Sequence, residues 1–209
     1  MLEEYCVCTK NIAFVHSKKK EVRSMILVLW ASPNLEGLTA QTKDRVLLGL
    51  AQTGAATETI HLNTRNIQRC LTCDNGWGTC RSKGSCIIAD DFASIYESMV
   101  RAEGIVFVTP VYWHDLAESL KTFLDRLRRC EAARNHFLKD KKCLLVACAG
   151  GSGNGAIKCL FNLEETLKHM GMKPVERLPV IQFNKSYMLP ALEGAGETFA
   201  EMIQADKGK

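Results

Sequence analysis

The sequence predicts an α/β fold, a three-layer sandwich in which helices cover both faces of a five-stranded parallel sheet of strand order 2-1-3-4-5. Two observations carry this prediction. Segments that are apolar at nearly every position, as strands buried on both faces are, alternate along the chain with segments in which apolar residues recur at helical spacing. Right-handed crossovers between successive parallel strands leave few topologies, and this order is the common one for five strands.

The first elements follow an N-terminal segment without clean periodicity. Residues 1–24 are interpreted as an extension outside the core, whereas residues 25–209 are expected to form one domain. Ile26–Trp30 is apolar throughout, which predicts the first strand. A helix is expected from residue 39 to about residue 51, and the alternating residues 57–62 predict the second strand.

The next helix follows a cysteine-rich insertion at residues 70–86. Asp90 and Asp91 carry the short acceptor side chains that cap helix N-termini, and apolar residues recur at helical spacing after them. We therefore expect a helix that begins at Phe92 and is capped by these two carboxylates.

The second half of the domain continues the alternation. Its strands are expected at residues 105–108, 143–148 and 175–183, and its helices at residues 116–127, 160–170 and 190–204. Gly171 is expected to end the second of these helices. Pro179 cannot donate to a central ladder, so the last strand is expected at a sheet edge.

Composition narrows the function. The chain has 209 residues, of which 46% are hydrophobic and 24% charged, and its net charge of +4 is small and dispersed, so nucleic acid is not expected as a partner. No apolar run approaches the ~20 residues needed to span a membrane, and the N-terminal apolar stretches are interrupted by polar residues, unlike a signal peptide. The protein is expected to be cytoplasmic.

The topology brings three loops together. Strands 1, 3 and 4 lie side by side in the predicted order, so the loops after them meet at one edge of the sheet, where such folds bind ligands. The first of these loops offers hydroxyls, an amide and the free N–H groups of a helix start, all suited to a phosphate. Its candidate ligands are Ser32, Asn34, Gly37, Leu38 and Thr39. The alternative is that these residues only make a turn and a cap.

The second loop, residues 109–115, has two adjacent aromatic residues where polar residues are expected. A flat heteroaromatic ligand packing on Tyr112 or Trp113 explains them, and the alternative is that they cover a helix end or face another subunit. The candidate ligand contacts in this loop are Pro110, Val111, Tyr112, Trp113 and His114.

The third loop is rich in glycine, which lets a backbone approach a ligand closely. Its candidate contacts are Gly150, Gly151, Ser152 and Gly153. The spacing Gly151-x-Gly153-x-x-Ala156 also passes a relaxed dinucleotide fingerprint. We reject that interpretation, because the fingerprint belongs to the first βαβ unit and too little chain follows it here.

Ten cysteines without a secretion signal point to metal or redox chemistry rather than to a disulfide framework. Four of them fall within seventeen residues, and these are the candidate metal ligands Cys70, Cys73, Cys80 and Cys86. They suit a [4Fe–4S] cluster or a structural zinc, and free thiols or disulfides are the remaining alternative. The apolar surroundings of Cys130, Cys143, Cys148 and Cys159 predict buried cysteines that act as small hydrophobic residues.

The three loops together resemble those of the NADPH-dependent FMN reductases of the flavodoxin-like superfamily. That family has a phosphate loop Gly-Ser-Pro-Arg-x-x-Gly-Asn-Thr and a flavin loop Ser/Thr-Pro-Val-Tyr-[aromatic]. The helix after the flavin loop reads Leu-Lys-x-Phe-[Leu/Ile]-Asp-Arg, which Leu120–Arg126 matches. The likeness covers about residues 25–185, and the segment Cys86–Asp91 further resembles the iron–sulfur flavoprotein branch.

This resemblance implies a flavodoxin-like domain that binds FMN, takes hydride from NAD(P)H at the flavin N5 and passes electrons to a small-molecule or protein acceptor. The flavin carries the chemistry, so no catalytic side chain is assigned. A cysteine-bound iron–sulfur cluster would convert two-electron into one-electron transfer. The family also implies a homo-oligomer, either a dimer or a tetramer.

Two departures from the family pattern bear on the sites. The family's loop arginine is Asn34 and its asparagine is Leu38, so a phosphate is expected to be held without a local cation. The cysteine spacing is Cys-x2-Cys-x6-Cys-x5-Cys, and its middle gap is four residues longer than in the compact pattern of the branch.

Two alternatives come from other functional classes. A signalling receiver domain has this strand order, but it needs acidic residues after strand 1 and at the end of strand 3. This chain has Ala31-Ser32 and Thr109-Pro110 there, which disfavours a receiver. A zinc-stabilised, flavodoxin-like binding module without redox activity is the other alternative, in which the glycine loops only turn corners.

Overall fold

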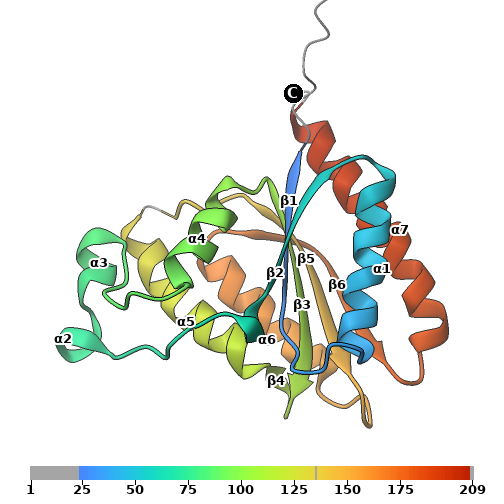
Figure 1. Cartoon of the computed structure of the whole chain (residues 1–209), viewed down its shortest axis with the longest axis horizontal. Coiled ribbons are helices and arrows are strands. Elements are labelled where there is room, and N and C mark those ends of the chain that lie inside the picture. Colours follow the sequence, from blue (N-terminus) through green and yellow to red (C-terminus); the bar gives the residue numbers. More distant parts are fainter. Residues whose placement is uncertain (1–23, 135, 208–209) are drawn as a thin grey trace, which may run out of the picture.

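The computed structural model describes residues 24–134 and 136–207, and its centre is one parallel sheet (Figure 1). The parallel strands are β1 (Met25–Trp30), β2 (Ala56–His61), β3 (Gly104–Tyr112), β5 (Lys142–Ala149) and β6 (Lys173–Ile181). Their order is β2-β1-β3-β5-β6, which is the predicted order 2-1-3-4-5. The predicted extension of residues 1–24 lies outside the described residues except for Ser24.

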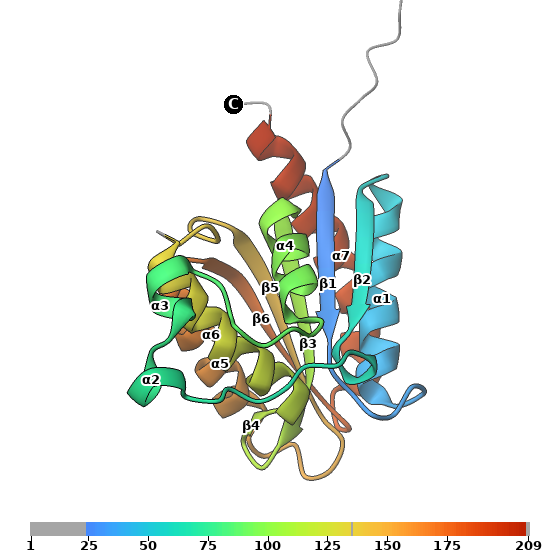
Figure 2. The same ribbon diagram turned by 60° about the vertical axis from the view of Figure 1, so that its left-hand side comes forward.

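Helices cover both faces of the sheet, as predicted (Figure 2). One face carries α1 (Leu38–Gln52) and α7 (Lys185–Lys207), and the other carries α4 (Phe92–Arg101), α5 (Glu118–Ala133) and α6 (Ala156–His169). The wholly apolar β1 explains the two cores, because its alternate side chains are buried in opposite layers. Ile26 and Val28 join the α1–α7 core, whereas Leu27 and Leu29 join the α4–α6 core.

Three short elements lie between β2 and α4 in the chain. They are the 3-10 helix η1 (Leu62–Thr64) and the helices α2 (Cys73–Gly76) and α3 (Thr79–Lys83). Helices α2 and α3 belong to the cysteine-rich insertion and stand beside α5, away from the sheet (Figure 1). None of the described helices is both long enough and apolar enough to cross a membrane.

The structure differs from the prediction most at the end of β3. The strand was expected to end at residue 108, but it continues through Pro110 to Tyr112 and folds back onto the two-residue strand β4 (Asp115–Leu116). Pro110 is the last residue paired with β5, and the next residue, Val111, pairs with Leu116 instead. The predicted second loop is therefore a β-hairpin. The last helix also begins at Lys185, earlier than expected, and includes Pro190.

Candidate functional site

The three loops that the sequence singled out lie at the same edge of the sheet. Strands β1, β3 and β5 are neighbours, and their carboxyl ends point the same way because they are parallel (Figure 1). The backbone N–H of Ala31 donates to Val108 O (2.9 Å), so the first loop leaves directly from the β3 ladder. The topology therefore places all three loops at the edge where folds of this class bind ligands.

In the first loop, the side chains of the candidate residues shape the loop itself. Ser32 is buried, and its hydroxyl donates to Asn34 O (3.1 Å) and accepts from Asn34 N (3.2 Å). The Asn34 side chain accepts from Glu36 N (3.0 Å). Because these polar groups already have partners, the loop presents mainly backbone to a ligand.

The start of α1 is the part of this loop suited to an anion. Gly37 is the N-cap residue, and neither a side-chain cap nor an acidic residue occupies the first turn. The first N–H groups of a helix have no partner within the helix, and the helix dipole adds positive charge there. Leu38 and Thr39 follow directly, so their N–H groups offer the anion site.

A histidine that the sequence analysis did not single out supports the first loop. His61 ends β2, and its Nε2 lies 2.8 Å from Ser32 O. Its ring stacks on Trp30, with the two centroids 3.8 Å apart and the planes 12° apart. Trp30 and His61 are register partners at the ends of adjacent strands. Once the strand order is known, that pairing is the signal that identifies His61.

The hairpin after β3 has a strained tip. Trp113 (φ 46°) and His114 (φ 69°) both adopt the left-handed conformation, as the two central residues of a type I′ turn do, although that turn favours asparagine and glycine. The Trp113 side chain is 93% exposed and the Tyr112 side chain is 45% exposed. Strain of this kind is kept where a function requires it, which makes the tip a candidate ligand contact.

The third loop lies against this tip. Gly155 has φ +87°, and a Cβ added there would lie 2.8 Å from His114 Cα. At Gly150 and Gly151, by contrast, an added Cβ would meet no heavy atom within 4 Å. The hairpin and the third loop are thus in contact, and the glycines between Ala149 and Ser152 leave open space beside them.

Replacing Gly155 with alanine is expected to separate the hairpin from the third loop. The left-handed φ costs an alanine roughly 1–2 kcal/mol, and the contact with His114 forces the backbone apart. Gly54→Ala is the matched control, because Gly54 has φ +71° but no atom near its Cβ position. Thermal unfolding should report a loss in both variants, whereas fluorescence titration with FMN should report weaker binding only for Gly155→Ala. Equal FMN affinity in both would contradict the role of this contact.

A cleft of about 380 Å³ lies on the β2 side of the hairpin. Pro33 of the first loop and Tyr112 of the hairpin contribute to it, and its other walls come from the segment after β2 and from the start of α5. The remaining lining residues are Leu62, Asn63, Arg65, Ile67, Ala117, Glu118, Ser119 and Thr122. No pattern in the sequence indicates this cleft, because it follows from the packing of η1 against α5.

The four clustered cysteines line a single small cavity. Cys70, Cys73, Cys80 and Cys86 are all half-buried around it, together with the two arginines Arg126 and Arg129 of α5. The four cysteines that are close in the sequence are thus also neighbours in space. Within the described residues, however, no three Cys, His, Asp or Glu side chains lie close enough together to hold a single metal ion.

The backbone beside this cavity is sharply bent. Asp74 (φ 47°), Asn75 (φ 58°) and Gly76 (φ 113°) follow one another in the left-handed region. Arg129 donates a hydrogen bond to Gly76 O, which ties the turn to α5. The turn is thus held from outside by an arginine and bends sharply between Cys73 and Cys80.

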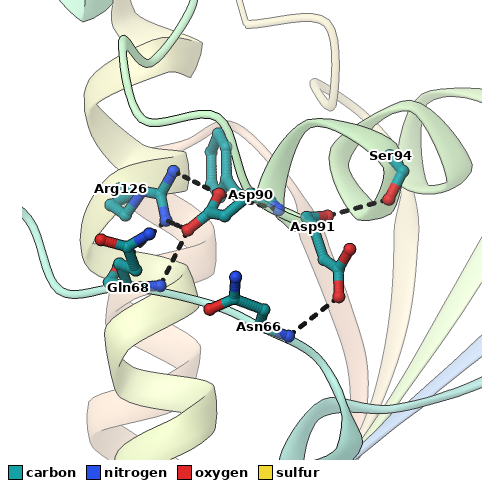
Figure 3. Close-up of polar contacts among 7 residues, drawn as sticks. Asn66, Gln68, Asp90, Asp91, Ser94 and Arg126 are labelled. Carbon is teal, nitrogen blue, oxygen red and sulfur yellow. Dashed lines mark hydrogen bonds and ion pairs between the residues drawn. The ribbon is translucent and has the colours of Figure 1, made fainter.

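A buried ion pair anchors the insertion to the domain (Figure 3). Arg126 and Asp90 form a bidentate ion pair with N···O distances of 2.6 and 2.9 Å, and both side chains are buried. Arg126 also donates to Gln68 O (2.9 Å), while Asp90 accepts from Gln68 N (2.8 Å). Burial alone raises the pKa of Asp90, but hydrogen bonds from Arg126, Gln68 and Phe92 hold that pKa below its ordinary value.

The predicted capping role of the two aspartates needs correction. Asp91 is the N-cap residue of α4 but makes no side-chain cap, and its carboxylate accepts from Asn66 N (2.8 Å) instead. Asp90 does accept from Phe92 N (3.2 Å), yet its strongest partner is Arg126. A charged guanidinium buried nearby competes for the carboxylate, and the sequence alone does not reveal that neighbour.

Helix α5 connects the cleft to the cysteine cavity. Ser119 and Thr122 line the cleft, and Arg126 and Arg129 line the cavity. Steps of three, four and three residues put these four side chains along one side of the helix. At 1.5 Å per residue, the distance from Ser119 to Arg129 along the helix axis is about 15 Å. The two sites are therefore close neighbours on one rigid element.

The four remaining described cysteines are buried, as predicted. Burial raises the pKa of Cys148 to about 11 and the pKa values of Cys130 and Cys159 to about 12, and it also raises the pKa of Cys143. These thiols stay neutral at physiological pH and pack as small hydrophobic side chains.

Comparison with known proteins identifies the family. The sequence pattern of the NADPH-dependent FMN reductases matches residues 24–184, which is most of the chain. The chain belongs to the NADPH-dependent FMN reductase family. This family member is also similar to several proteins named iron–sulfur flavoprotein. One of them, from Methanosarcina thermophila, is 31% identical over 122 residues, which are 57% of this chain and 60% of that protein.

Solved structures agree on the fold of this FMN reductase family member. A flavone reductase superposes with a TM-score of 0.68 at 18% identity, over 88% of this chain and 64% of the other. An archaeal flavodoxin superposes with a TM-score of 0.57 at 14% identity, over 86% and 99% of the two chains. The flavodoxin-like fold is thereby confirmed. The match spans about three fifths of the length of the curated relatives, 60% for the Methanosarcina protein.

Proposed function

We propose that this protein is an FMN-dependent oxidoreductase that takes hydride from NAD(P)H and passes electrons to a small-molecule or protein acceptor. One observation carries the proposal: three loops far apart in a chain of this family lie at one sheet edge, with an uncapped helix start, an aromatic hairpin tip and an open glycine backbone. When bound, FMN accepts a hydride and releases electrons singly or in pairs.

The residues then have separate tasks. The backbone N–H groups that follow Gly37 at the start of α1 hold the phosphate, so no cation is needed in that loop. Tyr112 and Trp113 of the hairpin border the ring system, and Gly150 and Gly151 let the third loop approach it. The protein positions the ring and excludes water, and no side chain acts as a nucleophile or a general base.

We further propose that the four clustered cysteines hold a [4Fe–4S] cluster that relays electrons from the flavin one at a time. The relatives named iron–sulfur flavoprotein and the shared cavity support this. A cluster spaces its four thiolates more widely than a single ion does, so the absence of a one-ion site within the described ranges weighs more against zinc.

Helix α5 also connects the two regions. Its stripe from Ser119 to Arg129 runs about 15 Å along the helix axis, between the cleft beside the hairpin and the cysteine cavity. Reduced cysteines of this kind fit the cytoplasm, where we propose that the protein works. Trp113 (93% exposed) and Phe183 (84% exposed) are suited to contact with a second subunit in a dimer or tetramer.

The proposal is tested on protein purified without oxygen. We expect yellow flavin absorbance with about one FMN per chain, a broad cluster absorbance, about four iron and four acid-labile sulfide per chain, and bleaching of the flavin by NADH or NADPH. Protein that fails to retain FMN on reconstitution would overturn the flavin assignment. Colourless protein containing zinc would instead favour the zinc-stabilised binding module.

The phosphate site is tested by two variants of one residue. Gly37→Asp and Gly37→Asn both supply a side-chain cap to α1, and only the first adds a negative charge. We expect both variants to fold, and Gly37→Asp to bind FMN at least about tenfold more weakly than Gly37→Asn, because the carboxylate repels the phosphate. Riboflavin, which lacks the phosphate, should not distinguish the two. Equal FMN affinities by calorimetry would refute this phosphate site.

A further inference from the structure

An unpaired nitrogen lies at the wall of the cysteine cavity. Among the described residues only two buried side-chain nitrogens lack a hydrogen-bond partner, and one of them is Nε of Arg126. The Arg126 side chain is 1% exposed, so bulk water does not reach this N–H group. A buried donor without an acceptor costs about 1–3 kcal/mol, so this nitrogen calls for an acceptor at the wall of the cavity.

The terminal nitrogens of Arg126 make three hydrogen bonds, which restrict how its guanidinium can move. Both terminal nitrogens bind Asp90, and one of them also donates to Gln68 O. The ring of Phe92 lies 4.3 Å from the guanidinium carbon and covers the group. These contacts fix the plane of the guanidinium, so Arg126 cannot turn to find another acceptor for Nε.

The surroundings of this arginine include sulfur. Arg126 lines the same cavity as the four cysteines, and the Cys86 thiol lies near enough to act on the guanidinium. Burial alone lowers the pKa of Arg126, but hydrogen bonding to Asp90 and Cys86 outweighs this and keeps the pKa above its ordinary value. The group is therefore a permanent cation at a cavity of thiols, and its Nε is the guanidinium nitrogen without a hydrogen-bond partner.

We propose that Nε of Arg126 donates an N–H···S hydrogen bond to the iron–sulfur cluster, to a cysteine thiolate or an inorganic sulfide, and thereby raises the reduction potential of that cluster. This inference rests on the proposed [4Fe–4S] site. Hydrogen bonds to the sulfurs and nearby positive charge stabilise the more negative, reduced form of such clusters. Arg126 is a positioning and tuning residue, and it does not ligate iron.

The first test measures the potential of the cluster. Arg126→Lys keeps a cation beside Asp90 but removes the Nε donor, and Arg129→Lys is the matched control at the same cavity. In redox titrations followed by electron paramagnetic resonance, we expect Arg126→Lys to shift the equilibrium about tenfold toward the oxidised cluster, or 59 mV lower for one electron. Arg129→Lys should shift it much less. An unchanged potential in Arg126→Lys with a full iron complement overturns the inference.

The second test avoids any dependence on how well Arg126→Lys assembles its cluster. Protein grown with ¹⁵N-arginine is reduced, and pulsed electron paramagnetic resonance is used to look for coupling between the cluster spin and an arginine nitrogen. We expect this coupling in the parent protein and in Arg129→Lys. Its absence from both overturns the inference while the proposed function stands. Iron-free parent protein overturns the cluster proposal and this inference together.

Discussion

Asp90→Ala is expected to destabilise the protein by about 3–5 kcal/mol, the largest loss of stability we foresee for a single substitution. Asp90 and Arg126 are buried together with N···O distances of 2.6 and 2.9 Å, so removing the carboxylate leaves a buried guanidinium without its counter-charge. The backbone N–H groups of Gln68 and Phe92 also lose the carboxylate that accepts their hydrogen bonds, which adds to this cost. Urea unfolding followed by circular dichroism measures the change.

The neighbouring aspartate provides the control. Asp91 accepts one exposed hydrogen bond from Asn66 N, so Asp91→Ala should cost about 1 kcal/mol or less. Acid gives a second signature. The pKa of Asp90 is lower in the folded protein than in the unfolded chain, so its contribution is complete above about pH 4 and is lost as the pH falls through the folded pKa. The parent should lose this stability in acid and Asp90→Ala should not. Equal losses in the two aspartate variants would contradict the buried pair.

The sequence was sufficient to predict the layers of the fold. The central parts of β1, β3 and β5 are buried on both faces, so they consist of apolar runs that the sequence shows directly. The strand order followed because right-handed crossovers exclude most alternatives. The grouping of four cysteines was equally visible, because short spacing along the chain constrains distance in space.

Features created by contacts between distant segments could not be predicted in this way. Nothing next to Asp90 in the sequence indicates that its carboxylate will pair mainly with Arg126, thirty-six residues later, rather than cap α4. Residues 109–115 read as a loop in the sequence, since Trp113 and His114 are not residues that favour a two-residue turn. The pairing of Val111 with Leu116 enforces that turn in the structure. The cleft near Tyr112 depends in the same way on how η1 meets α5.

Cys70→Ser is expected to abolish cluster binding and to leave FMN binding intact. This is the largest change in cofactor content that we expect from a single substitution. A serine hydroxyl is a much poorer ligand for iron than a thiolate, and four thiolates are needed to complete a [4Fe–4S] site. Iron and acid-labile sulfide should fall from about four per chain to near zero. Bound FMN should be unchanged, since Cys70 lines the α5 cavity and none of the three loops proposed to bind FMN does.

Cys159→Ala separates loss of a ligand from loss of a buried thiol. Cys159 is fully buried on α6 and outside the cavity, so this variant should lose stability but keep its iron. NADH or NADPH should still bleach the flavin in Cys70→Ser, while one-electron transfer to an acceptor such as cytochrome c should slow strongly. If Cys70→Ser kept its iron, the cluster would be held elsewhere. If Cys70→Ser lost iron and FMN together, the FMN site and the cysteine cavity would be coupled through α5. The proposal that the two sites bind their cofactors independently would then be wrong.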